Sequence, residues 1–312
     1  MKISTFIIIA FFCSQIICGQ HKKIEVTHKI KNDNSIEFYY KKNIPGSYYL
    51  KLEFDNLTNC NDRRAYEKII KHSAGSLFTL KPSNKNQGIS FSYKIIYTAG
   101  NPNPKIDEDI VYLLPFKTEK SVKIFEASNV GEKYFGSKKP IDWKSFIVYS
   151  TKSDTIYAMR KGIVVAISDT YNNDATFKKV YTSERNSILI EHIDGSVSSY
   201  KGFDKNKIFV KLGQEVYPHS FLGKLEKFNT PNYRLDFSVF HYLKNLLDTE
   251  KSTLKDRDHK VQFLDPVFFI ENANKKIKSR ETYQVLCNEN IKLQEFSRRE
   301  KRKYRKEPKF FE

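Results

Sequence analysis

The residues best suited to metal or nucleophilic chemistry are few in this 312-residue chain, and they stand apart from one another. It has seven histidines, and no two of them form an H-x-H or H-E-x-x-H motif; nor does any H-x-x-x-D occur. A hydrolytic zinc needs three protein ligands, usually histidine or carboxylate, and one open position for water. The sequence also lacks a P-loop, a G-x-S-x-G turn and a cysteine with a spaced histidine partner. These absences argue against the common zinc, nucleotide-dependent and acyl-transfer sites.

The first twenty residues predict export. Lys2 precedes an apolar run over residues 3–12, which is too short to span a bilayer, and Gly19 marks a plausible cleavage point. We therefore expect a signal peptide at residues 1–20 and a mature chain in the periplasm, the cell envelope or the extracellular space. Two cysteines remain after this segment, Cys60 and Cys287, and an oxidising compartment leaves open whether they pair or stay free.

The chain is strongly basic, with a formal net charge of +18. Such a balance favours anionic partners such as wall polymers or lipid surfaces. The charge is densest from Arg298 to Lys309, where eight basic residues stand against two acids. We expect residues 286–312 to form a solvated, disordered basic tail that can attract an anionic surface. Nucleic acid is not an expected partner.

Short β-branched and aromatic runs dominate both halves of the chain and predict a mainly β protein. Residues 21–104 indicate a β-sandwich-like domain, in which residues 65–75 could form one helix that ends at Gly75. The Asn-Pro-Asn-Pro run at residues 101–104 can continue neither strand nor helix and marks a domain boundary. A second domain should cover residues 105–285, with a further strand pair formed by residues 261–272 and 278–286.

Four pieces of the second domain occur in a recognisable order: "DTIYAMRKGIVVAI", "SILIEHIDGSVSSYKGF", "VKLGQEVYPHSFLGKL" and "YRLDFSVF". This order resembles the lysostaphin/LytM-type zinc peptidoglycan endopeptidases. The resemblance covers a little under half of the chain. It implies the small β fold called the duplicated hybrid motif, and it implies zinc as the cofactor.

The zinc ligands of that family do not carry over. In the family they are both residues of H-x-x-x-D and the last histidine of H-x-H. H-x-x-x-D falls on Trp143 to Ile147, and H-x-H falls on Arg234 to Asp236. A further family histidine, in Y-x-H, falls on Gly202. Moving the alignment of H-x-x-x-D along the chain does not supply its missing histidine, because no histidine occurs between His72 and His192. The chain therefore resembles a degenerate member of the family, and we expect no cofactor.

The residues at these positions define a candidate binding site. Strand alternation places Leu235 and Phe237 on one face, while Arg234 and Asp236 share the other face, where the metal would lie. Trp143, the only tryptophan, and Tyr200 complete the residues that we expect to line the former active-site cleft.

Three functions remain open from the sequence. The first is a non-catalytic protein that binds cell-wall peptide or a partner hydrolase through the former cleft. The second is an active zinc endopeptidase with relocated ligands, and the third is a secreted structural or adhesive protein that uses the β domain as a scaffold. Loss of every ligand with retention of the strand frame favours the first, so we expect no enzyme activity.

Overall fold

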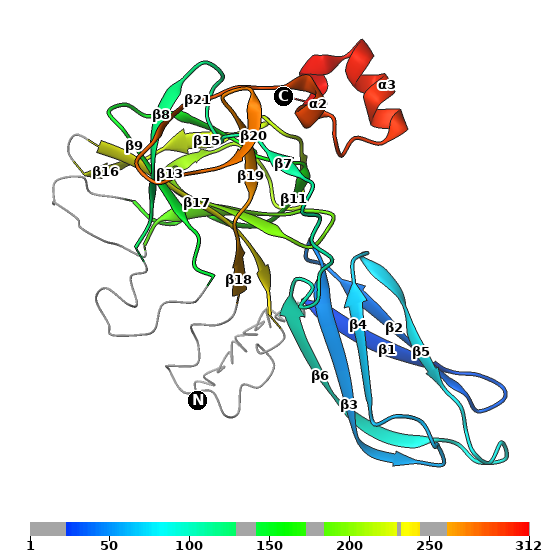
Figure 1. Cartoon of the computed structure of the whole chain (residues 1–312). Coiled ribbons are helices and arrows are strands. Elements are labelled where there is room, and N and C mark those ends of the chain that lie inside the picture. The colour runs from blue at the N-terminus through cyan, green and yellow to red at the C-terminus, as the bar shows by residue number, and fades with distance from the viewer. Residues whose placement is uncertain (1–22, 129–141, 173–183, 230–231, 244–260, 312) are drawn as a thin grey trace, which may run out of the picture.

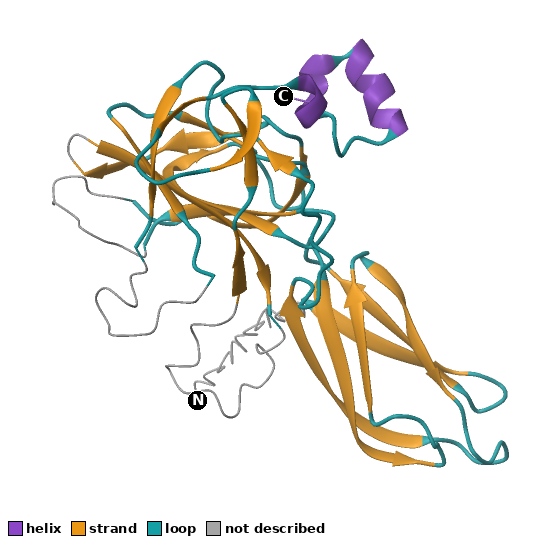
Figure 2. Cartoon of the chain, viewed as in Figure 1, coloured by secondary structure: helices purple, strands orange, loops and turns teal. Residues whose placement is uncertain are grey.

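The computed structural model describes residues 23–128, 142–172, 184–229, 232–243 and 261–311. Figure 2 shows that strands dominate, which confirms the expected mainly β fold. The expected signal peptide at residues 1–20 lies outside the described residues. Among the helices of the described part of the chain, none is both long and apolar enough to cross a membrane.

The N-terminal strands form two three-stranded antiparallel sheets that enclose a core of their own (Figure 1). In β2, alternate residues Ile36, Phe38 and Tyr40 are buried, and Leu50 and Leu52 of β3 face them from the other sheet. One sheet has the order β1-β2-β5 and the other β4-β3-β6. Their bounds are β1 (Ile24–Ile30), β2 (Ile36–Lys42), β3 (Tyr48–Thr58), β4 (Ala65–Ile70), β5 (Ala74–Leu80) and β6 (Ser90–Ala99).

The helix expected over residues 65–75 is wrong. This segment contains β4 and the start of β5. β4 pairs with β3 over six residues, from Glu53 opposite Ala65 to Tyr48 opposite Ile70, while β5 joins the other sheet. Long-range pairing with β3 and β2 supplies backbone partners to most of this segment, and this outweighs the weak helical pattern of a short segment.

The second region is built around a twelve-stranded sheet whose main path runs β14-β11-β12-β13-β17-β9-β8-β21. Its inner face holds the largest core of the described chain, including Phe146, Ile188, Phe203 and Leu222. The strands are β8 (Ser121–Glu126), β9 (Phe146–Ser150), β10 (Thr155–Tyr157), β11 (Gly162–Ser168), β12 (Asn186–Glu191), β13 (Val197–Ile208), β14 (Glu215–Val216), β15 (Phe221–Leu225), β16 (Lys227–Asn229), β17 (Asn232–Tyr242), β18 (Val261–Leu264) and β21 (Thr282–Gln284).

The strands after residue 260 exist as expected but have other partners. β18 pairs with β17, and β21 pairs with β8. β19 (Val267–Ile270) pairs with β20 (Ala273–Lys276) and, in parallel, with β7 (Val111–Tyr112). The two segments meet only through an isolated bridge from Ile270 to Val285. β18 and β21 therefore join the twelve-stranded sheet at different places. Local sequence patterns do not specify these pairing partners.

The C-terminal residues are folded, so the expectation of a solvated, disordered tail is wrong. They form α2 (Glu289–Lys292), α3 (Arg298–Lys306) and the 3₁₀ turn η3 (Pro308–Phe311). Buried Phe296 and Phe311 pack with Tyr217 of the sheet region and hold these helices against it. Phe296 before α3 and Phe311 after it therefore supply the apolar contacts, which the run of charged residues in α3 does not suggest.

The two regions meet at closely packed glycines. Ser47 N donates a hydrogen bond of 2.6 Å to Glu191 Oε2. Gly46 has φ +82°, and a Cβ there would lie 2.5 Å from Val165 Cγ1. A Cβ on Gly100 would lie 2.1 Å from the ring of Tyr242. The domain boundary at residue 104 stays a prediction, for which limited proteolysis should release a fragment that begins near Lys105.

Candidate functional site

β17 carries the residues expected at the former metal position, and its burial pattern follows strand alternation. Leu235 and Phe237 are 0% and 1% exposed and belong to the main core. Arg234 and Asp236 are half-buried on the opposite face. The register is therefore the one that places these two charged side chains side by side.

Arg234 and Asp236 form a two-point ion pair. Arg234 Nε donates to Asp236 Oδ1 at 2.6 Å, and Arg234 Nη2 donates to Asp236 Oδ2 at 2.8 Å. Two parallel N–H···O bonds fix the guanidinium in the plane of the carboxylate, which a single bond would not do. The carboxylate that stands at a ligand position is thus already engaged by a cation.

A second arginine, from the segment that enters β12, joins this pair. Arg185 Nε donates to Glu226 Oε1 at 3.1 Å, and Arg185 Nη2 donates to the carbonyl oxygen of Arg234. Its Nη1 lies 3.1 Å from Asp236 Oδ2 but makes no hydrogen bond there. We call the side chains of Arg185, Glu226, Arg234 and Asp236 the charge cluster. Two cations and two carboxylates make its formal charge zero.

The sequence did not point to Arg185 or Glu226. The two residues are 41 positions apart, and both are almost fully buried, at 3% and 4% side-chain exposure. No motif or spacing links them to β17. Each is a charged residue next to a short apolar strand, Arg185 before β12 and Glu226 after β15. Charged residues in such positions are common on protein surfaces, so they did not indicate a buried pair.

Gly202 makes room for Arg185. Its φ is +122°, and a Cβ there would lie 2.2 Å from both Arg185 Nη2 and the carbonyl oxygen of Arg234. This conformation and this contact exclude other residues without a shift of the backbone. Gly202 stands where the resembling family has the histidine of Y-x-H. A histidine side chain at this position would compete for the space that Arg185 fills.

Aromatic rings cover the cluster. The Cζ atoms of Arg185 and Arg234 lie 5.0 and 4.8 Å from the ring centre of Phe228. Arg234 also lies 5.8 Å from the ring of Tyr149, which is opposite it on β9 and is 44% exposed. Such cation–π contacts stabilise a partly desolvated guanidinium. Tyr149 is the aromatic residue that a ligand at this face would meet.

The strand register brings two of the ligand positions of the resembling family together. Ile147 of β9 lies directly opposite Asp236 of β17. On its other side, Asp236 lies opposite Lys201 of β13. Of the ligand positions Trp143, Ile147 and Asp236, only Asp236 offers a metal-binding oxygen, and guanidinium groups surround it. The residues present do not fit zinc.

Trp143 lies away from the charge cluster. Its indole Nε1 donates a 2.8 Å hydrogen bond to the carbonyl oxygen of Ala127, and its ring centre lies 4.7 Å from that of Phe263. Phe263 belongs to β18 and lies opposite Phe240, four residues beyond Asp236 on β17. The structure therefore places Trp143 beside β18, as packing for that strand.

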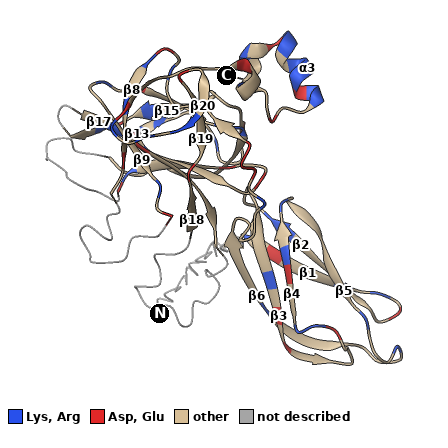
Figure 3. Cartoon of the chain, in the orientation of Figure 1, with Lys and Arg blue, Asp and Glu red and all other residues tan. Residues whose placement is uncertain are grey.

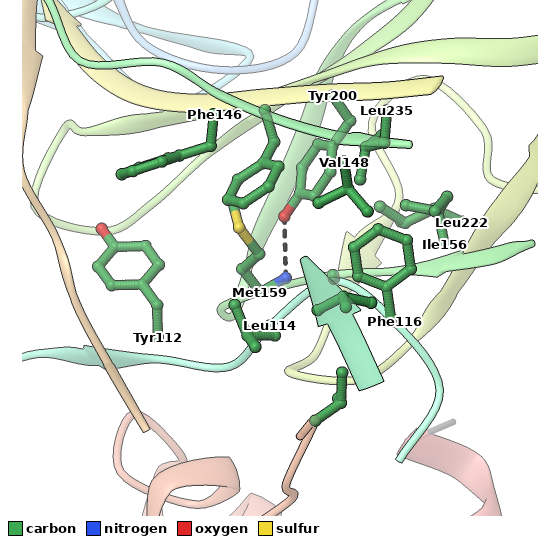
Figure 4. Close-up of a cluster of buried hydrophobic side chains, with 14 of the residues drawn as sticks. Tyr112, Leu114, Phe116, Phe146, Val148, Ile156, Met159, Tyr200, Leu222 and Leu235 are labelled. Carbon is green, nitrogen blue, oxygen red and sulfur yellow. Dashed lines mark hydrogen bonds between the residues drawn. The ribbon is translucent and has the colours of Figure 1, made fainter. Parts of the chain in front are cut away.

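Tyr200 is a core residue. Its side chain is 0% exposed, and its hydroxyl accepts a 2.8 Å hydrogen bond from Met159 N (Figure 4). It lies opposite Phe237 and thus shares the inner face of the sheet, while Arg234 and Asp236 share the outer one. Burial raises the pKa of the Tyr200 phenol. A ligand at the charge cluster would not reach this group, so the placement of Tyr200 in the cleft needs correction.

His192 is buried, and both of its ring nitrogens have hydrogen-bond partners. Its Nδ1 lies 2.6 Å from the carbonyl oxygen of Lys161, and its Nε2 lies 2.6 Å from Ser198 Oγ. Burial, and secondly the charge of Arg160, holds its pKa far below the ordinary value. His192 is thus a neutral structural residue. Among the described residues, no three His, Cys, Asp or Glu side chains are grouped so as to hold a metal ion.

A separate pocket lies where the two regions meet. Its volume is about 240 Å³, and its walls include Ser47, Lys71, Lys161, Glu191 and Ile193. Glu191 is at the end of β12 and pairs with Val197, whereas Asp236 pairs with Lys201 near the middle of β13. The pocket is therefore distinct from the charge cluster, and no sequence pattern predicted it.

Comparison with known proteins gives a fold likeness and no family. No family model and no curated protein matches the chain. Among solved structures, the SpoIIQ–SpoIIIAH pore-forming complex matches at 15% identity and TM-score 0.29, over 50% of this chain and 89% of that one. A putative M23 peptidase from Pseudomonas aeruginosa matches at 14% identity and TM-score 0.27, over 63% and 88%.

A zinc-containing peptidase from Vibrio cholerae matches at 12% identity and TM-score 0.24, over 69% of this chain and 81% of that one. TM-scores this low assign neither a family nor an activity.

Proposed function

We propose that this chain is an exported, non-catalytic relative of the lysostaphin-like endopeptidases that binds cell-wall peptide or a partner hydrolase through the former active-site cleft. The observation that carries the proposal is the charge cluster. At the positions where the resembling family holds zinc, two arginines and two carboxylates neutralise one another. In this proposal, guanidinium groups lie where a metal would otherwise activate water.

Electrostatics oppose a return of the metal. A divalent cation that approached Asp236 would have to displace Arg234 from a two-point ion pair and would lie close to Arg185. Zinc sites need preformed, deprotonated ligands in tetrahedral geometry. The proposal therefore includes the absence of a bound zinc cofactor.

The same geometry suits the binding of an acceptor group. Arg185 Nη1 is buried, 3.1 Å from Asp236 Oδ2, so a ligand would meet the groups of the site that reach solvent. The guanidinium of Arg234, whose side chain is 13% exposed, would donate to a carbonyl or carboxylate oxygen of a peptide. Exposed Tyr149 offers a further contact at the outer face.

The experiment measures binding of the purified mature chain to isolated cell-wall sacculi, together with zinc content by mass spectrometry and digestion of cross-linked muropeptides. We expect binding without digestion and less than stoichiometric zinc. Arg234→Ala and Tyr149→Ala should weaken binding, and Arg64→Ala, an exposed arginine of the other region, should not.

Muropeptide cleavage with zinc near one per chain would favour an active peptidase with relocated ligands instead. Binding that is unchanged in both cleft variants would favour the scaffold alternative, in which other surfaces make the contact. A partner hydrolase would be recognised by loss of its co-purification in the same two variants.

The basic C-terminal segment supplies a second, independent contact in this proposal, with an anionic surface of the envelope. Its cations face away from the sheet region, as described next.

A further inference from the structure

α3 is a rigidly capped helix rather than a loose charge run. Ser297 accepts a hydrogen bond from Glu300 N at 3.2 Å, and Glu300 Oε2 accepts one from Ser297 N at 2.7 Å. This reciprocal capping box satisfies two backbone donors at the helix start. A nine-residue helix of this composition would be marginal alone, because like charges repel along it. Its stability must come from docking.

One face of α3 docks on the sheet region. Glu300 Oε1 lies 2.5 Å from Lys161 Nζ and 3.2 Å from the hydroxyl of Tyr217. Tyr304, one turn further on, packs edge to face on Phe296 at 6.0 Å. Burial alone would raise the pKa of Glu300, but Lys161 and Ser297 lower it to about 2. The docked face of α3 is thus held by the ion pair of Glu300 with Lys161 and by the aromatic contact of Tyr304.

The opposite face carries only cations. At 100° per residue, the arc opposite Glu300 and Tyr304 holds six side chains, and all six are exposed. None of them makes an ion pair with a described residue. They are Arg298, Arg299, Arg302, Lys303, Arg305 and Lys306. Figure 3 shows much of the α3 ribbon in the blue of Lys and Arg, and Figure 1 shows α3 standing out from the sheets.

An exposed aromatic residue lies at the edge of this cationic face. Phe310 of η3 is 58% exposed, and Lys303 Nζ lies 2.9 Å from its ring centre. The neighbouring Phe311 is 1% exposed and anchors the turn. The docked turn therefore holds Phe310 outward beside the cations.

We propose that the face formed by these six cations and Phe310 is a docking surface for an anionic phospholipid bilayer. Because α3 stands out from the sheets, its cationic face is accessible to an extended flat surface (Figure 1). Cations near such a surface gain electrostatic attraction from anionic headgroups, and an aromatic ring settles at the headgroup level.

This inference deepens the anionic-surface part of the proposed function and does not depend on the cleft. Arg234→Ala should leave bilayer binding unchanged. A loss of binding at the cleft can therefore be told apart from a loss of binding to the bilayer. The docking contacts hold the face in place, since Lys161 and Tyr217 belong to the sheet region.

The test is sedimentation of the full chain with vesicles of equal parts phosphatidylglycerol and phosphatidylcholine, against pure phosphatidylcholine vesicles. We expect at least about tenfold tighter binding to the anionic vesicles, which is lost as salt rises. The triple variant R299E/R302E/K306E should lose about tenfold or more. The matched control K29E/K81E/K85E changes the net charge equally at exposed positions of the N-terminal region and should lose much less.

Phe310→Ala should weaken binding about threefold and leave its salt dependence in place. If the triple variant does not fold, the neutral variant R299Q/R302Q/K306Q gives the same comparison, with about half the loss. Equal losses in the triple variant and its control would overturn the proposal, because bulk charge would then explain binding. Equal binding to both vesicle types, or a duplex DNA that binds more tightly and displaces the vesicles, would also overturn it.

Discussion

Two buried arginines organise opposite parts of the sheet region, and they differ in how completely they are satisfied. Arg160 is 1% exposed and donates through Nε and Nη2 to Glu295, at 2.9 and 2.8 Å. Its Nη1 donates to Asp194 at 2.9 Å, Tyr112 at 3.0 Å and Ser196 at 3.1 Å. Arg185 is buried to a similar degree, yet its Nη1 has no hydrogen-bond acceptor.

Under the proposed function, this difference separates a structural latch from a binding site. Arg160 connects the β12–β13 turn, through Asp194, with the C-terminal segment, through Glu295, and leaves no donor for a ligand. The charge cluster around Arg185 connects neighbouring strands and opens to solvent at Arg234 and Asp236. Of the two arginine clusters, only the charge cluster reaches solvent, through Arg234 and Asp236, as the proposed binding site requires.

The largest effect should come from Arg160→Ala. The change leaves the carboxylates of Asp194 and Glu295, 5% and 7% exposed, without their cation. We expect a loss of about 3–5 kcal/mol in the free energy of unfolding, measured by urea denaturation. Proteolysis should also begin within residues 286–311. Arg298→Ala, at an exposed position, should change stability by about 0.5 kcal/mol or less.

Arg185→Met should cost less, about 2–3 kcal/mol, because only one buried carboxylate, Glu226, loses its arginine, while Asp236 keeps Arg234 and reaches solvent. Met retains most of the apolar stem against Phe228, so the loss reports mainly on the charged contacts. The same denaturation series measures it. A loss as large as that of Arg160→Ala would show that the two clusters are both structural latches and would remove the contrast between them.

A double-mutant cycle of Arg234→Ala and Asp236→Ala should give a coupling energy of about 1 kcal/mol. The side chains are 13% and 24% exposed, so water screens the pair in part. Sacculus binding in the same variants should fall more than stability does. A coupling well above this range would mean that the pair contributes mainly to folding.

Lowering the pH should reduce the free energy of unfolding through His192, whose pKa is lowered in part by the charge of Arg160. Its pKa in the folded chain is held below the ordinary 6.5 by burial and by Arg160, so the unfolded chain binds the extra proton first. Stability should therefore be unaffected at pH 7 and should fall as the pH drops below about 6.5. In His192→Gln the slope of stability between pH 7 and about 5 should flatten, and in exposed His28→Gln it should not.

Zinc should have the smallest effect. Stoichiometric zinc, or a chelator, should shift the melting temperature by less than about 1 °C, since the ligand positions hold Trp143, Ile147 and an engaged Asp236. A rise of several degrees with zinc, reversed by chelator, would contradict the view of the charge cluster as a replacement for the metal.

The sequence was sufficient for statements that depend on local pattern or on composition. Period-two alternation placed Leu235 and Phe237 inward and Arg234 and Asp236 outward, because successive side chains of a strand point to opposite faces. Turn residues and β-branched runs identified most strands. The lack of histidines between His72 and His192 removed the family's first zinc ligand wherever the alignment is set.

Other features depended on contacts between distant residues and were settled by the tertiary structure. Arg185 and Glu226 meet Asp236 because three strands and a glycine at φ +122° bring them there, and no spacing encodes that approach. Tyr200 faces the core because it lies opposite Phe237, although its motif suggested the cleft. The basic tail is folded because Tyr217 and Lys161, more than eighty residues earlier, offer an aromatic and an ionic partner. Local sequence fixes which face a side chain takes, while packing between distant segments determines what it meets there.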